Sequence, residues 1–142
     1  MIVRGFFRRG APYFSANVLF LHLHCYVWFL ADTGASRTVL SALDANILGV
    51  RPEYLKPTEE QMVALGGSFS SFRLSNVRLA FDADEGRMLV DTDIFLARYD
   101  WEHLLQDEAD RILRLPSVMG QDILSRFRFT CDHRAGIVQL EQ

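Results

Sequence analysis

Apolar and polar residues alternate along most of the chain, in short runs separated by turn residues. Apolar, aromatic and β-branched residues that recur with a period of two are typical of β-strands. Clusters of glycine, proline and aspartate divide these runs into segments of strand length. We therefore expect a mainly β protein. The predicted strands are residues 13–21, 25–30, 38–40, 61–65, 69–74, 77–81, 88–97, 127–132 and 137–140.

Two places in this pattern predict more than a strand. Gly66-Gly67 lies between the strand-like runs 61–65 and 69–74, which is the arrangement of a β-hairpin. After the second run the alternation changes phase at Asn76. A strand with a period of two changes phase only at a bulge or where a new strand begins, so we expect one of these features there.

Two or three short helices are expected among the strands. Ser41 is a suitable N-cap for a short helix that ends at Gly49. Residues 100–115 carry apolar side chains at helical spacing between charges, which predicts an amphipathic helix. Residues 122–127 predict another short helix, with Asp122 as its N-cap.

The chain of 142 residues has the length of one domain and contains no repeat or Pro/Gly-rich linker. A chain of this length buries enough surface to fold without a disulfide or a metal ion. We expect residues 1–11 to form a flexible N-terminal arm and residues 12–142 to form a single domain.

Charge and cysteine content restrict the class of function. The formal net charge is −3, whereas nucleic-acid binders usually carry a basic face. Cys25 and Cys131 are too few for a disulfide framework, which favours a reducing compartment. The most apolar stretch, 18–30, is shorter than the roughly twenty residues of a membrane span. With no signal-peptide pattern at the N-terminus, we expect a cytoplasmic protein without a membrane or nucleic-acid partner.

The segment with the clearest chemical meaning is Asp32-Thr33-Gly34-Ala35, directly after an apolar run. A carboxylate at the end of a buried strand is held on a rigid element, and Gly34 lets backbone amides approach it closely. The segment resembles the active-site motif of the aspartic peptidases, which is apolar-apolar-x-Asp-Thr/Ser-Gly-Ala/Ser.

The order of the later segments is similar to that of the retropepsin-like aspartic peptidases, over about residues 12–141. Lobes of that family continue to a short strand, here 38–40, and then to a glycine-tipped hairpin called the flap. They end with Gly-x-Asp/Asn leading into a short helix. The flap positions here are Leu65, Gly66, Gly67 and Ser68, and the last element includes Val118, Met119, Gly120, Gln121 and Asp122.

The resemblance implies a closed, barrel-like β lobe that is half of an aspartic peptidase. Asp32 belongs to the only Asp-Thr-Gly in the chain. The segment Asp91-Thr92-Asp93 cannot replace a second one, because it carries a side chain where the motif needs glycine. A homodimer is therefore expected, in which the Asp32 residues of two copies meet at a twofold axis.

The same resemblance implies roles for the motif residues. The two Asp32 carboxyls share a proton, as in aspartic proteases generally, and hydrolyse peptide bonds through an activated water without a cofactor or metal. The Thr33 hydroxyl braces the dimer, the Gly34 amide binds the carboxylate, and the flap closes over an extended peptide. Gly120 and Asp122 are expected to be structural, as a turn and a helix cap.

The sequence differs from the viral members of this family in two linked places. Many of them have an acidic residue just after Gly-Ala, paired with an arginine in the Gly-Arg-Asp/Asn element. Ser36 and Gln121 occupy these positions here, and both are neutral. The helix expected at 100–115 is also longer than viral lobes carry there, and would reshape the dimer contact or cover part of the cleft.

Three alternatives stay open at this point. Asp32 could be a turn residue of an unrelated β protein. The lobe could also be a non-catalytic module for dimerisation or peptide binding. Finally, one metal set is conceivable if the strands that carry it were neighbours, because its tetrahedral zinc ligands would lie two residues apart on each strand. That set is His22, His24, Cys131 and His133.

Overall fold

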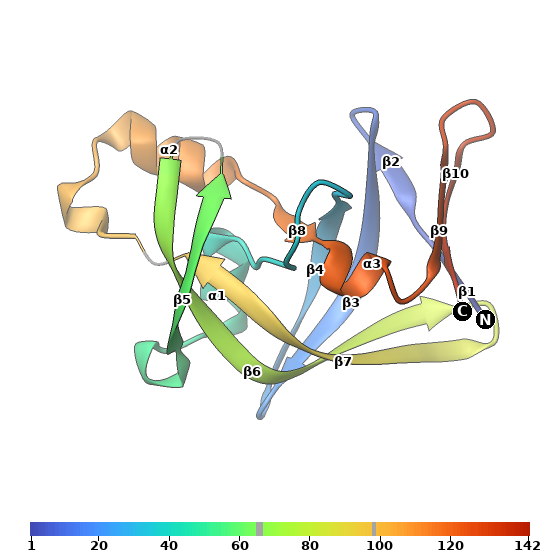
Figure 1. Cartoon of the computed structure of the whole chain (residues 1–142), viewed down its shortest axis with the longest axis horizontal. Helices are drawn as coiled ribbons and strands as arrows, with labels where there is room; N and C mark the ends of the chain where they lie inside the picture. The colour runs from blue at the N-terminus through green and yellow to red at the C-terminus, as the bar shows by residue number, and fades with distance from the viewer. Residues whose placement is uncertain (65–66, 98) are drawn as a thin grey trace.

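Two β-sheets make up most of the computed structural model (Figure 1), which describes residues 1–64, 67–97 and 99–142. The smaller sheet has the order β1-β10-β9. The larger has the order β5-β6-β3-β4-β8, with β2 on β3 and β7 on β6. The strands are β1 Ile2–Arg4, β2 Phe6–Arg8, β3 Ala11–Phe20, β4 Leu23–Ala31, β5 Lys56–Ala64, β6 Gly67–Ala83, β7 Gly86–Ala97, β8 Ser117–Met119, β9 Arg128–Asp132 and β10 Ile137–Glu141.

The expected mainly β architecture is confirmed, but the larger sheet does not close into a barrel among the described residues. The gap lies between β7 and β8. Residues 38–40 span it, with Val39 paired to Phe95 on one side and to Val118 on the other. The strand expected at 38–40 is thus reduced to isolated bridges, and the described residues form no continuous ladder between β7 and β8.

The phase change expected at Asn76 is a bulge within the long strand β6. The register between β6 and β7 shifts between Leu74 and Val77, and Asn76 has a φ of 61°. Asparagine tolerates this left-handed conformation better than most residues. Because of the bulge, the Leu74 and Val77 side chains are both fully buried although they lie three positions apart.

The core is built from alternate positions of the strands and includes side chains of both sheets. Phe14 of β3, Phe29 of β4 and Phe81 of β6 are completely buried. Each fully buried aliphatic or aromatic side chain contributes about 1.5–3 kcal/mol of transfer free energy, which makes this cluster the main stabilising term.

Residues 1–11 form β1 and β2 and are not the arm that the sequence predicted. β1 pairs with β10 from the other end of the chain, and its Val3 side chain is buried in the core. The Ile2 amide donates to the Asp84 carboxylate at 2.8 Å, and this hydrogen bond lowers the pKa of Asp84. The two ends of the chain therefore lie side by side (Figure 1).

The described residues form three α-helices: α1 Ala42–Leu48, α2 Gln106–Arg114 and α3 Gln121–Leu124. The same residues include short 3₁₀ turns at Pro52–Tyr54 and Trp101–His103. The helix expected after Ser41 is confirmed, since the Ser41 hydroxyl accepts the Asp44 amide at 3.1 Å and Gly49 is left-handed. Among the described residues, no helix has the length and apolar character needed to cross a membrane.

The helix expected over 100–115 is shorter than predicted and begins at Gln106. Leu104 and Leu105 have extended backbone, which separates α2 from the 3₁₀ turn before it. The Glu108 carboxylate accepts the Leu105 amide at 3.3 Å and so satisfies one of the free donors at the start of the helix. The amphipathic pattern of residues 100–115 could not show where the helix begins, because its start depends on this local hydrogen bond at Leu105.

A matched pair of leucines tests where the core lies. Replacing Leu79 of β6, which is fully buried, by alanine should lower the free energy of unfolding by about 3 kcal/mol, because it leaves a cavity. Chemical denaturation monitored by tryptophan fluorescence measures the change.

The control is Leu89→Ala on the neighbouring strand β7, where the side chain is 53% exposed. It should cost about 0.5 kcal/mol or less. Equal losses of unfolding free energy in the two variants would contradict the assignment of Leu79 to the core and of Leu89 to the surface.

Candidate active site

Asp32 follows the last residue of β4 and begins a tight turn. Its amide donates to the Met119 carbonyl of β8 at 3.0 Å, so the parallel pairing of β4 and β8 extends to the aspartate. The Gly34 amide donates to Asp32 Oδ1 at 2.9 Å, and the Ala35 amide donates to the Asp32 carbonyl at 3.2 Å. The carboxylate is thereby fixed on a rigid strand end while remaining partly exposed to solvent.

The first turn of α3 supports this loop from the other side. The Gln121 side-chain amide donates to the Thr33 carbonyl at 2.9 Å, and the Gln121 backbone amide donates to the Ala35 carbonyl at 2.8 Å. The sequence marked Gln121 and Ser36 only as neutral replacements for a charged pair. In the structure Gln121 is a direct support of the Asp32 loop, a contact that residue spacing alone could not reveal.

Asp122 is not the N-cap of α3, which is Gly120, and its carboxylate reaches across to Thr38. One oxygen accepts the Thr38 amide at 2.9 Å and the other accepts the Thr38 hydroxyl at 2.7 Å. The same hydroxyl accepts the Gly120 amide at 3.1 Å. Thr38 is completely buried, so these bonds satisfy groups that would otherwise be costly to bury.

Gly120 has no room for a side chain. A Cβ at this position would lie 2.5 Å from the Arg37 carbonyl oxygen and 2.8 Å from the Ala35 carbonyl oxygen. The expected structural importance of Gly120 therefore has a steric cause, which is the close packing of two backbone segments. Asp122 is likewise structural in geometry, although not as the predicted cap.

The predicted flap is only partly described. Leu65 and Gly66 lie outside the described residues. Gly67 and Ser68 begin β6, where they pair with Ala64 and Val63 of β5. The two flanking strands thus form an antiparallel ladder, as the sequence predicted.

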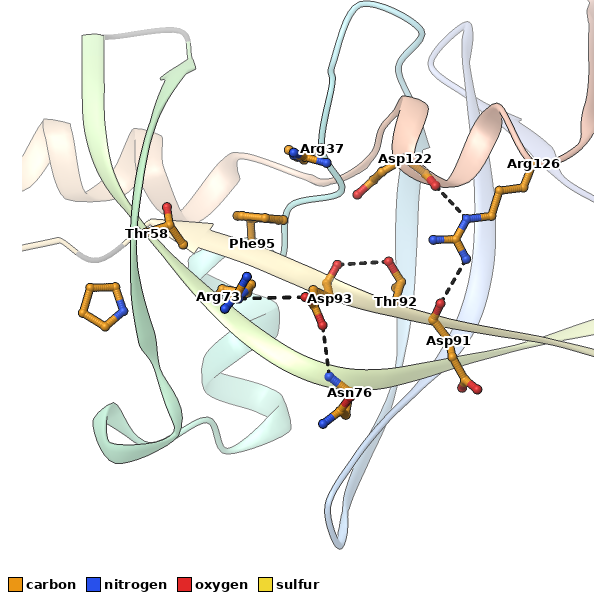
Figure 2. A pocket seen from close by; sticks show the side chains of 11 residues that line it. Arg37, Thr58, Arg73, Asn76, Asp91, Thr92, Asp93, Phe95, Asp122 and Arg126 are labelled. Carbon is orange, nitrogen blue, oxygen red and sulfur yellow. Dashed lines mark hydrogen bonds and ion pairs between the residues drawn. The ribbon is translucent and has the colours of Figure 1, made fainter.

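A pocket of about 810 Å³ lies between this ladder and the loop that follows Asp32 (Figure 2). Arg37 comes from that loop, Thr58 and Arg73 from the ladder strands β5 and β6, and Phe95 from β7. Asp122 of α3 closes another side. Asp32 itself is not among the lining residues, so the pocket borders the loop that follows the aspartate and not the aspartate itself.

The residues of the zinc alternative are not brought together. His24 lies on β4 of the larger sheet, whereas Cys131 lies on β9 of the smaller sheet. The His133 ring contacts the Phe7 ring at a tilt of 32°, and its Nε2 lies 2.9 Å from the Gly10 carbonyl oxygen. Within the described part of the chain, no group of three or more His, Cys, Asp or Glu side chains is placed to hold a metal ion.

Two solved structures with a similar fold are proteases. A retropepsin-like aspartic protease from Rickettsia conorii matches with 23% identity and a TM-score of 0.54, over 99% of this chain and 88% of that chain. EIAV protease in complex with the inhibitor HBY-793 matches with 17% identity and a TM-score of 0.54, over 83% of this chain and 88% of that chain.

This chain has the retropepsin-like fold. The likeness is carried by the structure, since no protein-family model and no curated protein matches the sequence. Both comparison structures span most of the chain, so the fold extends well beyond the Asp32 motif.

Thr38 offers a test of the network behind the retropepsin-like loop. Thr38→Val keeps the volume but removes the hydroxyl that bonds Asp122 and Gly120, leaving buried polar groups unsatisfied. We expect the free energy of unfolding to fall by about 2 kcal/mol, measured by chemical denaturation.

Thr130→Val on β9 is the matched control, because Thr130 makes no side-chain hydrogen bond within the described part of the chain. It should change the stability by less than about 0.5 kcal/mol. A Thr38→Val variant as stable as this control would show that the network contributes little.

Proposed function

We propose that this chain is an aspartic endopeptidase that is active as a homodimer. The observation that carries the proposal is the geometry of Asp32 within a retropepsin-like fold. Its carboxylate projects from a rigid strand end, accepts the Gly34 amide and stays accessible to solvent. This is the placement that a general base needs in order to reach a bound water.

A second copy is needed because one chain offers one such carboxylate. Asp91, in the other Asp-Thr pair, lies on β7 and is held by two hydrogen bonds from the Arg78 guanidinium. In a twofold dimer the surface around Asp32 meets its own copy, which brings two carboxylates together. Two such groups at short distance share one proton, so one acts as base while the other donates.

The remaining site residues have supporting roles in this proposal. Thr33 braces the dimer, and Gly34 and Ala35 hold the loop. The hairpin of β5 and β6, with Leu65, Gly66, Gly67 and Ser68 at its tip, acts as the flap over an extended peptide. The reaction is hydrolysis of a peptide bond by the activated water, without a covalent intermediate.

We also propose that the protein works in the cytoplasm. Cys25 and Cys131 are both free thiols. A reducing compartment keeps thiols in this state.

Asp32→Asn tests the catalytic proposal. The amide cannot act as a base, so cleavage of a diverse peptide library between pH 4 and 7 should fall by at least about a hundredfold. Mass spectrometry of the products measures the rate. In the wild type, the rate per chain should also rise with protein concentration, because only the dimer has two carboxylates.

The control is Asp82→Asn, which removes an exposed carboxylate of β6 away from the site. It should cleave like the wild type. Equal cleavage by the wild type and the Asp32→Asn variant would assign the activity to a contaminant. If neither cuts while both bind peptides, the non-catalytic binding module replaces the peptidase.

Gln121→Ala tests whether the Asp32 loop depends on its side-chain support. Loss of the hydrogen bond to the Thr33 carbonyl should lower kcat/KM by about tenfold, because a small displacement of a catalytic group has a large effect on rate. Steady-state kinetics on one library-derived peptide measures it.

Gln106→Ala on the exposed helix α2 is the matched control and should leave kcat/KM unchanged. An unaltered kcat/KM in Gln121→Ala would remove Gln121 from the supporting set.

A further inference from the structure

Several aromatic side chains lie on the outer face of the strands β2, β3 and β4, on the side away from the core. Phe14 of β3 and Phe29 of β4 point inward and are fully buried. Since neighbouring residues of a strand point to opposite faces, Tyr13 and Trp28 lie on the outer face. Phe6 of β2 pairs directly with Tyr13 and therefore belongs to the same face.

These rings contact one another and form a continuous surface. The Phe6 ring stacks on the Tyr13 ring at a centroid distance of 5.9 Å and meets the Trp28 ring edge-on at 5.3 Å. Tyr26 extends the cluster along β4, two residues before Trp28. The Tyr26 and Trp28 side chains are 61% and 51% exposed. A contiguous exposed apolar surface of this kind marks an interaction site in many soluble proteins.

A cation completes the cluster. The Arg8 guanidinium of β2 lies over the Trp28 ring, 5.2 Å from its centre. Within the described part of the chain Arg8 forms no ion pair, so no carboxylate neutralises its charge. Stacking on the ring orients the planar guanidinium and leaves its edge free to donate hydrogen bonds. We call the set Phe6, Arg8, Tyr13, Tyr26 and Trp28 the aromatic face.

The charge of the aromatic face differs in sign from that of the whole chain. The strands β2, β3 and β4 contain no aspartate or glutamate, whereas the formal net charge of the chain is −3. Arg9 follows Arg8 in the turn between β2 and β3 and adds a second exposed cation. A ligand that complements this face carries a negative charge beside an apolar group.

The carboxylates on neighbouring elements do not cancel this charge. On the adjoining strands β6 and β7, Asp91 is bound by Arg78 at 2.8 Å. Asp82 lies 3.8 Å from Arg87 and is paired with it. Asp32, which follows β4, forms no ion pair within the described residues. The guanidinium on the aromatic face is therefore available to an external carboxylate.

These features suit a protein partner better than a lipid membrane or a second copy of the chain. Anionic membranes attract clusters of about four to eight lysines and arginines, and this face offers Arg8 and Arg9. Two copies joined through this face by a twofold axis would place the same cations against each other. Tyrosine, tryptophan and arginine are the residues that contribute most to binding at protein–protein interfaces.

We propose that the aromatic face docks an acidic peptide segment of another protein, in which an aspartate or glutamate neighbours an aromatic or aliphatic residue. The carboxylate binds the stacked Arg8 guanidinium, where paired hydrogen bonds give both affinity and orientation. The apolar side chain packs on Trp28 and Tyr26. This interaction goes beyond the proposed peptidase function and does not depend on it, because the Asp32 carboxylate takes no part in it.

The two tryptophans of the chain provide a reporter and an internal control. Trp28 belongs to the aromatic face, whereas Trp101 lies in the 3₁₀ turn before α2 and is 44% exposed. NMR follows both indole Nε1–H signals of the wild type during titration with the acetylated and amidated peptide Gly-Ser-Glu-Phe-Glu-Ser-Gly. We expect the Trp28 signal alone to shift. Replacing both Glu residues of the peptide by Gln should weaken binding about tenfold.

Arg8→Gln should weaken binding of the Glu peptide by a similar factor, because it removes the cation and keeps the length of the side chain. Arg51→Gln, an exposed arginine before the 3₁₀ turn Pro52–Tyr54, is the matched control and should bind like the wild type. No Trp28 shift at millimolar peptide would overturn the proposal. So would equal affinity for the Glu and Gln peptides, or unchanged binding by an Arg8→Gln variant that is folded by circular dichroism.

Two further titrations test the other occupants. A Trp28 shift caused by vesicles of equal parts phosphatidylcholine and phosphatidylserine, but not by the Glu peptide, would replace the peptide by a lipid surface. A Trp28 shift that follows protein concentration alone would replace it by a second copy. Asp32→Asn should bind the Glu peptide like the wild type, so a failure of the peptidase proposal leaves this result standing.

Discussion

The hydrogen bonds from Thr38 to the Asp122 carboxylate hold together the part of the molecule on which the site depends. They join the segment after the Asp32 loop to the first turn of α3, two segments 84 positions apart in the sequence. Gly120 allows the two backbones to meet with no side chain between them. Without this contact the Asp32 turn would lack the support of Met119, Gln121 and α3.

That arrangement also explains how one small lobe can present an accessible carboxylate without losing its shape. The polar groups near Asp32 are satisfied mainly by backbone contacts and by buried side chains such as Thr38. Among the described residues, the Asp32 side chain accepts the Gly34 amide and forms no ion pair. Its carboxylate remains partly exposed to solvent.

Sequence patterns predicted the features that local physics decides. Ser41 as a cap and the phase change at Asn76 depend only on neighbouring residues, and both are confirmed. The Asp32 motif predicted the fold because it resembles the motif of the retropepsin-like peptidases, and the solved structures confirm that fold. Long-range contacts were not predictable. Asp122 looked like a cap because its distant partner was unknown, and residues 1–11 looked unpaired because their partner β10 lies at the other end of the chain.

The pairing of β1 with β10 places the chain ends within one strand spacing of each other, and the Gln142 amide donates to the Met1 carbonyl at 3.2 Å. Adjacent strands are about 5 Å apart, so a few residues suffice to join the ends. The order of the strands and helices along the chain can then be changed while their arrangement in space stays the same. A circular permutant opened at the β3–β4 turn, where Leu21 is 68% exposed, would keep every layer of the fold while placing new ends away from the terminal sheet.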